Sequence, residues 1–270
     1  MITREPFNMS DGSGWTSPLV LLYNVFGGIG RAGCMTFQAL LFMLGIPFSR
    51  RAVHEWFKQM YTASIKTLPL VTIVGLFTGM ILALQVGLEL RRYSQEVFIG
   101  SAVMLSLLRE MGPFMAGIIL SACVGSSMAA QIGTMTVNEE IAALEIMSIN
   151  PIRFLMAPRM GAMVLATPLI SFYTCVLGVC GGGLVGSTQL GVPWRQYIQN
   201  SLQFAEVRDL YVGLLKALFF GIIVTGVSCY EGFTTTQGAV GVGQATRRSV
   251  ITSILLILII GYMVTRFFYE

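Results

Sequence analysis

The chain has 270 residues, of which 54% are hydrophobic and only 11% are charged. Soluble domains usually carry about 25% charged residues, so the composition excludes an ordinary soluble protein and predicts an integral membrane protein. The net charge is +4, but the basic residues are scattered beside apolar runs, which argues against a nucleic-acid-binding surface. The five cysteines have no zinc-ligand spacing, and we interpret them as small apolar packing residues.

The N-terminal part, residues 1–66, is predicted to be a cytoplasmic and interfacial segment. Residues 18–46 are apolar but are interrupted by several glycines, Asn24, Arg31 and Gln38. Such a segment suits an amphipathic helix in the membrane interface better than a lipid-exposed span. Residues 28–33 match the pattern GxGxxG, but no strand precedes them, so we interpret these glycines as part of a helix and not as a dinucleotide site.

Residues 67–270 contain five apolar segments, each long enough to cross a bilayer core that requires about 20 residues. They cover residues 67–90, 97–133, 158–190, 210–230 and 249–268. The predicted fold class is therefore an all-α integral membrane protein with an N-terminal interfacial helix, five transmembrane helices and a short cytoplasmic helix. In the first span, Gly75, Gly79, Ala83 and Gly87 recur every four residues and predict close helix packing.

The distribution of basic residues predicts the orientation, because cytoplasmic loops carry an excess of Lys and Arg. With the N-terminus inside, the inner set is the larger one and comprises Arg4, Arg31, Arg50, Arg51, Lys58, Lys66, Arg153, Arg159, Arg247 and Arg248. The outer set comprises Arg91, Arg92, Arg195, Arg208 and Arg266. Since the number of spans is odd, the C-terminus is expected on the outer side.

The stretch "SLLREMGP", residues 106–113, places two charged residues inside an apolar segment. Neighbours on a helix point about 100° apart, so Arg109 and Glu110 each require a different partner. Ionised groups at membrane depth are costly unless they face water, protein or a polar ligand. A straight helix over residues 97–133 would be about 55 Å long, more than a core of about 30 Å needs, so it must protrude, tilt or break. Gly112 and Pro113 are the place where we expect a break.

Lys216 in the fourth span is the next intramembrane charge. In the predicted orientation Arg109, Glu110 and Lys216 all fall toward the outer leaflet, and their charges sum to +1. A phospholipid phosphate would neutralise this sum and accept hydrogen bonds from both cations, which predicts a headgroup site. A purely structural charge cluster is the alternative. Apolar residues at similar depth would contact acyl chains or serve in ordinary packing, namely Leu84, Leu88 and Leu105.

Residues 134–151, "TMTVNEEIAALEIMSINP", predict a short amphipathic helix on the cytoplasmic side. Thr136 and Glu139 have the capping-box spacing, Glu139 and Glu140 suit the positive end of a helix dipole, and Pro151 is expected to end the helix. The helix would either lie on the headgroups or dock a soluble partner. The residues expected to make the docking contacts are Glu139, Glu140, Ile141, Leu144, Glu145 and Met147.

Three stretches carry a resemblance to a known family: "LLREMGPFMAGIIL", "GTMTVNEEIAALEIMSINPIRFLMAPR" and "GQATRRSV". They resemble the signatures of the MlaE/YrbE-type ABC-transporter permeases, and the resemblance extends from about residue 68 to residue 268. It implies a permease homodimer in the bacterial inner membrane, two cytoplasmic ABC ATPase subunits, a periplasmic MCE-domain protein and phospholipid as the transported molecule. It also implies that residues 137–148 form the coupling helix and that the "LLRE" and "LLK" residues line the lipid pocket.

The chain has no GxxxxGK[ST] pattern, so we expect no cofactor in this chain and ATP hydrolysis in a separate subunit. Cys123 and Gln131 stand where relatives often carry arginine and glutamate, which we interpret as a deleted ion pair. A secondary transporter is one alternative function, although five spans without inverted repeats fit it poorly. A lipid-modifying membrane enzyme is another, but His54 is the single histidine and lies outside the spans.

Overall fold

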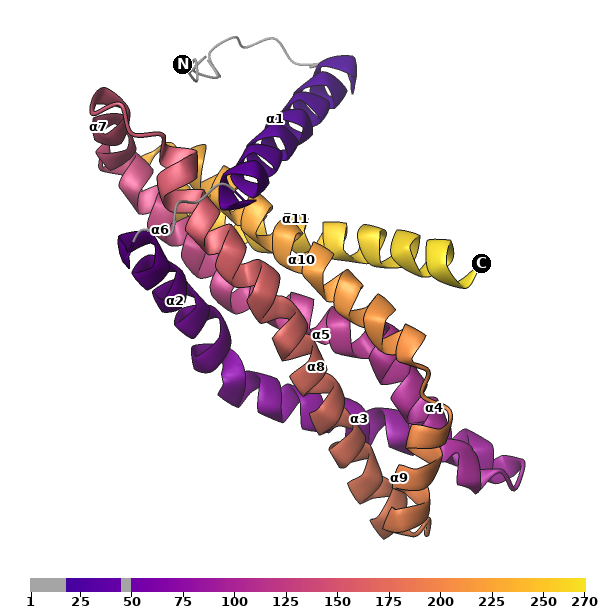
Figure 1. Ribbon diagram of the computed structural model, residues 1–270. Coiled ribbons are helices and arrows are strands. Elements are labelled where there is room, and N and C mark those ends of the chain that lie inside the picture. Colours follow the sequence, from indigo (N-terminus) through magenta and orange to yellow (C-terminus); the bar gives the residue numbers. More distant parts are fainter. Residues whose placement is uncertain (1–17, 45–49) are drawn as a thin grey trace.

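The computed structural model describes residues 18–44 and 50–270, and within these ranges every regular element is a helix (Figure 1). In chain order the α-helices are α1 (Pro18–Leu44), α2 (Arg50–Ser64), α3 (Leu68–Arg92), α4 (Ile99–Ser106), α5 (Gly112–Leu120), α6 (Ser126–Val137), α7 (Glu140–Ile146), α8 (Ala157–Thr188), α9 (Trp194–Gln203), α10 (Val207–Phe233) and α11 (Gly238–Tyr269). The 3-10 turns are η1 (Ile65–Thr67) and η2 (Glu96–Phe98), and the π-helical segments are η3 (Leu107–Met111), η4 (Ser121–Gly125) and η5 (Ile152–Met156). The predicted all-α fold class is confirmed.

Across the described ranges, five helical stretches are long and apolar enough to cross a membrane, which confirms the predicted number of spans. They are Trp56–Arg92, Glu96–Val137, Ile152–Thr188, Val207–Phe233 and Gly238–Tyr269. The first begins before the predicted residue 67, because α2 continues through η1 into α3. The fourth begins before the predicted residue 210 and thereby includes Asp209.

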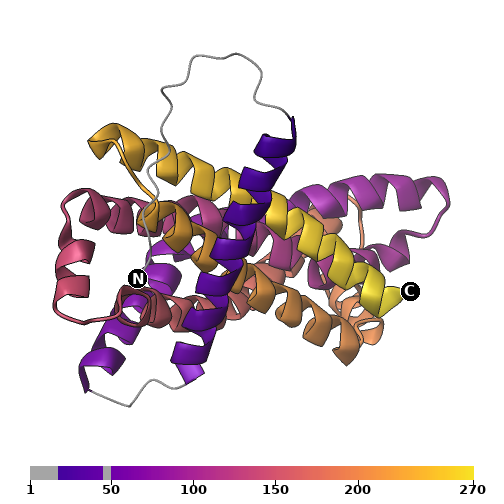
Figure 2. The same cartoon turned by 90° about the horizontal axis from the view of Figure 1, so that it is seen from above.

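Helix α1 crosses the bundle instead of running along it. Figure 1 shows α1 lying across the direction of α8 and α10, and the view from above in Figure 2 shows the same crossing. It contacts α8, α10 and η5. This arrangement does not fix its depth in a bilayer, so the interfacial placement stays a prediction. Residues 1–17 and 45–49 of the predicted N-terminal segment lie outside the described residues.

The bundle has two distinct ends (Figure 1). The α7 end contains α7 and the α10–α11 turn. The helices that precede them are joined there, because the Thr136 hydroxyl of α6 donates a hydrogen bond to the Gly232 carbonyl of α10 over 3.0 Å. The α9 end contains α9 and the turn between α3 and η2. There the Asn200 side chain donates a hydrogen bond to the Val97 carbonyl over 2.7 Å.

Helices α3 and α8 are packed with their backbones in contact, as the small-residue ladder predicts. Gly75, Gly79, Ala83 and Gly87 are all buried in α3. A Cβ atom added to Gly79 would overlap the backbone of Gly178 in α8. Because only glycine allows this approach, the ladder fixes how α3 lies on α8.

The second span is helical from Glu96 to Val137, so the predicted break at Gly112 and Pro113 is wrong. The chain forms the π turn η3 instead, in which the Gly112 N–H donates to the Leu107 carbonyl. Pro113 follows as the second residue of α5. The wider π turn accommodates Pro113, which has no backbone N–H to donate, and the helix therefore continues past it.

Candidate functional site

Two ion pairs connect the second and fourth spans at the η3 turn. The Arg109 Nε donates to Asp209 Oδ1 over 2.8 Å, and its Nη2 donates to Asp209 Oδ2 over 3.1 Å. The Lys216 Nζ donates to Glu110 Oε1 over 2.7 Å. The adjacent residues Arg109 and Glu110 therefore have different partners, as their positions on a helix predict.

The proline after this turn explains a further bond of Lys216. In an α-helix the N–H of residue 113 would donate to the carbonyl of residue 109, but Pro113 has no N–H. The Lys216 Nζ donates to this Arg109 carbonyl over 2.7 Å. The ammonium group thus donates to a backbone carbonyl that lacks its usual α-helical donor.

Helix α11 completes the cluster with two hydroxyl groups. The Thr265 hydroxyl donates to Glu110 Oε1 over 2.6 Å and accepts from Lys216 Nζ over 2.7 Å. The Tyr269 hydroxyl donates to Asp209 Oδ1 over 2.6 Å. The Arg109 guanidinium also lies 4.6 Å from the centre of the Tyr269 ring, which is a cation–π distance. We call these residues the charge network: Arg109, Glu110, Asp209, Lys216, Thr265 and Tyr269.

The predicted net charge of +1 at this site is wrong, because it omitted Asp209. The four ionisable groups of the two ion pairs sum to zero. The omission arose because the predicted fourth span began at residue 210, whereas α10 begins at Val207. Asp209 precedes Lys216 by seven residues, a spacing that places both on one face of a helix, and this signal could have identified it. Thr265 and Tyr269 carried no comparable signal in the sequence.

Burial divides the network into a hidden side and an accessible side. The side chains of Asp209 and Lys216 are each only 1% exposed. Those of Arg109 and Glu110 are 40% and 43% exposed. One cationic and one anionic group are therefore open to water, lipid or another subunit, while their counter-charges are fixed inside the bundle.

The three predicted acyl-chain residues are not part of the network. Leu84 and Leu88 lie on α3 and are 38% and 51% exposed. Leu105 lies on α4 and is half-buried, one helical turn before Arg109. No hydrogen bond or ion pair ties them to the charged residues, so their assignment to acyl chains stays a prediction.

The predicted docking helix is shorter than expected, and its predicted capping box is wrong. Helix α7 comprises 7 residues. Thr136 belongs to the preceding helix α6, and its hydroxyl donates to the carbonyl of Ile132 over 2.9 Å. Glu139 precedes α7 in a left-handed conformation with φ 61° and makes no side-chain cap. The sequence pattern failed because α6 extends to Val137 and uses Thr136 itself.

The end of α7 and its exposed surface also differ from the prediction. The helix ends at Ile146, and Pro151 instead precedes η5. Ile141 is buried in a core cluster, against which Leu144 packs. Met147 is 61% exposed and Ile146 is 85% exposed. The apolar surface available to a partner is therefore Ile146 and Met147, and Ile146 was missed because it lies off the predicted stripe.

Glu139, Glu140 and Glu145 are all exposed around α7, which agrees with their predicted accessibility. We call residues 145–147 the α7 tip, because this acidic and apolar surface projects from the bundle (Figure 1).

Gln131 has a partner in the third span. Its Oε1 accepts a hydrogen bond from Arg159 Nη2 over 3.3 Å. Arg159 is buried, and its Nη1 donates to the Leu155 carbonyl over 3.0 Å. The Arg159 Nε has no hydrogen-bond partner among the described residues. The amide of Gln131 therefore takes a position where a carboxylate would form an ion pair.

These features define a multi-pass α-helical membrane protein that keeps ionised side chains within its spans, which is a common property of transport proteins. Residues 56–267 match the family of MlaE permeases. The chain therefore belongs to the MlaE permease family.

Three relatives illustrate the similarity. A probable ABC transporter permease protein of Rickettsia prowazekii is 39% identical over 213 residues, covering 79% of this chain and 82% of the relative. The intermembrane phospholipid transport system permease protein MlaE of Haemophilus influenzae is 35% identical over 243 residues, covering 89% and 91%. A probable ABC transporter permease protein of Synechocystis is 32% identical over 231 residues, covering 86% and 87%.

Proposed function

We propose that this permease is the transmembrane subunit of an ABC transporter that moves phospholipids across the space between the inner and outer membranes of a bacterium. The observation that carries the proposal is that Arg109 and Glu110 are half-exposed, while their counter-charges Asp209 and Lys216 are buried within the spans. The Haemophilus relative, which is named as a phospholipid transport permease, supports the choice of substrate.

The accessible side of the network suits a zwitterionic headgroup. A phosphate can accept charge-assisted hydrogen bonds from the outer edge of Arg109. A headgroup amine can donate to the free oxygen of Glu110. Asp209 and Lys216 hold the two groups in place by binding them from the buried side. In this proposal the acyl chains contact Leu84, Leu88 and Leu105.

The proposed assembly contains two copies of this chain, two cytoplasmic ABC ATPase subunits and an MCE-domain protein on the periplasmic side. The chain itself holds no ATP, and the ATPase subunits supply the hydrolysis. The α7 tip docks into an ATPase groove, where Ile146 and Met147 supply apolar contact and Glu145 meets basic residues. The N-terminus lies in the cytoplasm and the C-terminus lies in the periplasm.

The headgroup proposal is tested by replacing Arg109 with Ala in the complete transporter. Asp209 loses its counter-charge, so the protein should unfold at a lower temperature, but Asp209 keeps its bond from Tyr269 and we expect the complex to assemble. Co-purified phospholipid should fall about tenfold, as loss of a charge-assisted hydrogen bond predicts. ATP-dependent lipid transfer between labelled vesicles should fall in parallel. The matched control is Arg91→Ala, because Arg91 is an exposed arginine that pairs with Glu96 over 3.4 Å and is not part of the charge network.

Unchanged phospholipid content and transfer in Arg109→Ala would contradict the headgroup proposal. Loss of the assembled complex in Arg109→Ala, with Arg91→Ala intact, would instead favour a structural charge cluster. Lipid transfer that continues without ATP would favour a secondary transporter.

The docking proposal is tested separately with Ile146→Ser and Met147→Ser combined. Both side chains are exposed, so the permease should fold normally while its stimulation of ATP hydrolysis falls at least about tenfold, because the apolar anchor of the interface is lost. The matched control is Leu202→Ser, an apolar residue that is 64% exposed at the α9 end. Normal ATPase binding and stimulation by the double variant would show that the α7 tip is not the docking surface.

A further inference from the structure

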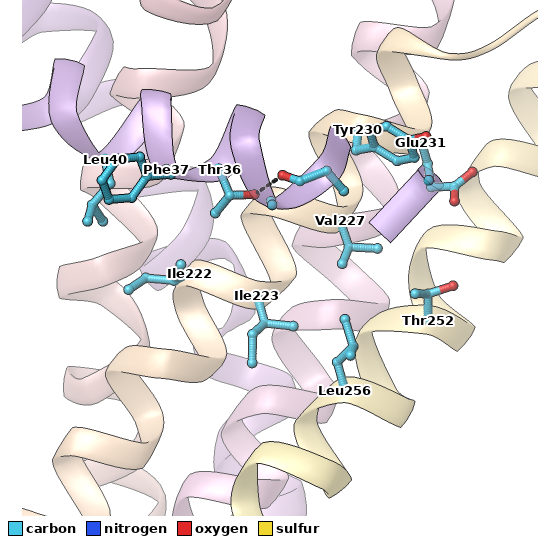
Figure 3. Close-up of a pocket in the computed structure, with 14 residues that line it drawn as sticks. Thr36, Phe37, Leu40, Ile222, Ile223, Val227, Tyr230, Glu231, Thr252 and Leu256 are labelled. Carbon is cyan, nitrogen blue, oxygen red and sulfur yellow. Dashed lines mark hydrogen bonds between the residues drawn. The ribbon is translucent and has the colours of Figure 1, made fainter. Parts of the chain in front are cut away.

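A cavity lies between α1, α10 and α11, away from the charge network. Its volume is about 680 Å³, within the range of about 300–1,000 Å³ that is typical of small-molecule sites. Its wall is mainly apolar and includes Phe37 from α1, Ile223 from α10 and Leu256 from α11. Figure 3 shows these side chains around the space.

The cavity exists because α1 presents small residues to α10. Gly28 and Gly33 both line it, and a Cβ atom added to Gly33 would meet nothing within 4 Å. At Gly226 the two helices approach closely, since a Cβ atom there would lie 2.5 Å from the Thr36 hydroxyl. Gly28 and Gly33, which the sequence pattern could not assign to a nucleotide site, therefore leave an open space beside a close helix contact.

The cavity is polar at one end and apolar at the other. Tyr230 and Glu231 lie at one end of the view in Figure 3, and Ile223 and Leu256 lie at the other. The polar end is the α7 end of the bundle, because the neighbouring Gly232 carbonyl accepts the hydrogen bond from Thr136. Helix α10 ends at Phe233, so Glu231 lies in the last turn of the fourth span.

Glu231 supplies the charge that selects a ligand. It is half-buried at the cavity wall, and the hydrogen bonds and ion pairs found among the described residues do not include its carboxylate. The positive charge of Arg248 on α11 acts on it from a longer distance. A carboxylate at the edge of the hydrocarbon favours a cationic partner, since an unpaired charge there is costly. The amine of a phospholipid headgroup provides such a partner, and its acyl chain matches the apolar part of the cavity.

We propose that this cavity binds an aminophospholipid from the leaflet at the α7 end, with its amine on Glu231 and an acyl chain between α1, α10 and α11. The site is separate from the charge network. Lys216 and Tyr230 are about 20 Å apart along α10, and the cavity side of α11 carries Thr252 and Leu256, whereas the network uses Thr265 and Tyr269. Binding here does not depend on the proposed direction or coupling of transport.

The test uses the complete transporter in bilayers of phosphatidylethanolamine and phosphatidylglycerol that contain a phosphatidylethanolamine with a photoreactive acyl chain. Cross-links are mapped by mass spectrometry. Gly33→Leu fills the cavity, and cross-linking to α1, α10 and α11 at the cavity should fall at least about fivefold. Gly30→Leu is the matched control, because a Cβ atom on Gly30 also meets nothing within 4 Å but Gly30 does not line the cavity. This control should cross-link like the wild type.

The headgroup is tested with Glu231→Gln in the same bilayers. The preference for phosphatidylethanolamine over an equivalent phosphatidylglycerol probe should fall about tenfold, as loss of one charge-assisted hydrogen bond predicts. Gly33→Leu should leave lipid retention at Arg109 unchanged, and Arg109→Ala should leave cavity cross-linking unchanged. The proposal for the cavity and the proposal for the charge network can therefore be contradicted separately.

Equal cavity cross-linking in Gly33→Leu and the wild type would overturn the proposal, as would an unchanged lipid preference in Glu231→Gln. A photoreactive residue at Leu256 that captures a second copy of this chain and no lipid would also overturn it, because the cavity would then be a subunit contact. If Gly33→Leu fails to assemble, Gly33→Val provides a smaller filling of the same space, with the same expected loss.

Discussion

At the scale of single residues, the charge network shows how a membrane protein keeps ionised groups within its spans. Each buried charge of the network has a partner of opposite sign and at least one hydroxyl or backbone bond as well. Lys216 alone contacts the Glu110 carboxylate, the Thr265 hydroxyl and the Arg109 carbonyl. Such complete satisfaction is required because an unpaired polar group inside the bundle is costly.

Lys216 and Glu110 form an ion pair but differ in burial, so we predict that removing one of the two charges destabilises the protein more than removing the other. Glu110→Gln leaves the ammonium of Lys216, which is 1% exposed, without a counter-charge and should destabilise the protein by about 3 kcal/mol. Lys216→Met should cost less, because the remaining Glu110 is 43% exposed and can reach water. The double variant should be more stable than Glu110→Gln alone. Thermal unfolding of the purified variants checks this order, and strictly additive losses would contradict it.

At the scale of helices, close contacts between backbones determine the arrangement more than side-chain chemistry does. Helix α3 lies against α8 through a row of small residues, and the π turn η3 lets the second span pass Pro113 without ending. The same turn brings Arg109 and Glu110 to α10. The π turn η3 therefore determines both the path of the second span and the position of its two charged side chains.

Two glycines of the same ladder should respond differently to the same substitution. A Cβ atom on Gly79 overlaps the Gly178 backbone, whereas one on Gly75 makes an ordinary contact at 3.4 Å with Leu177. Gly79→Ala should lower stability by about 1–3 kcal/mol through overpacking. Gly75→Ala should be neutral or raise stability slightly, because alanine favours the helix. The melting temperatures of the two variants, measured side by side, test this difference, and equal values would contradict the close approach of Gly79 to Gly178.

At the scale of the whole molecule, the two ends of the bundle have different chemistry. The charge network lies within the spans on the α9 side of the bundle, at η3 and the first turns of α10, while the α7 end carries the α7 tip and the polar end of the cavity. Helices α10 and α11 contribute to both regions. A ligand at either end therefore contacts the same two helices, about 20 Å apart along their length.

The predicted orientation places the α7 end in the cytoplasm and can be tested with single cysteines in a variant that lacks the native ones. The two variants are Gln95→Cys and Thr236→Cys. Gln95 lies in the turn between α3 and η2, Thr236 lies in the α10–α11 turn, and both residues are exposed. An impermeant thiol reagent added from the periplasmic side should label Gln95→Cys and not Thr236→Cys. The reverse pattern would invert the proposed topology, and disruption of the membrane should expose both positions equally.

The amino-acid sequence was sufficient to predict the class of this protein, the number of spans and the need for separate partners at Arg109 and Glu110. These properties depend on composition and on helical periodicity, which act over a few residues. The tertiary structure was needed to show that Asp209 and Thr265 complete the network, since they lie 100 residues from Arg109 and 155 residues from Glu110 in the chain. Likewise, Ile141 is buried and Ile146 is exposed, because Ile141 packs into a core cluster with residues of α1, η5, α8 and α10. Partners so distant in sequence are fixed by helix packing, and no local pattern encodes that packing.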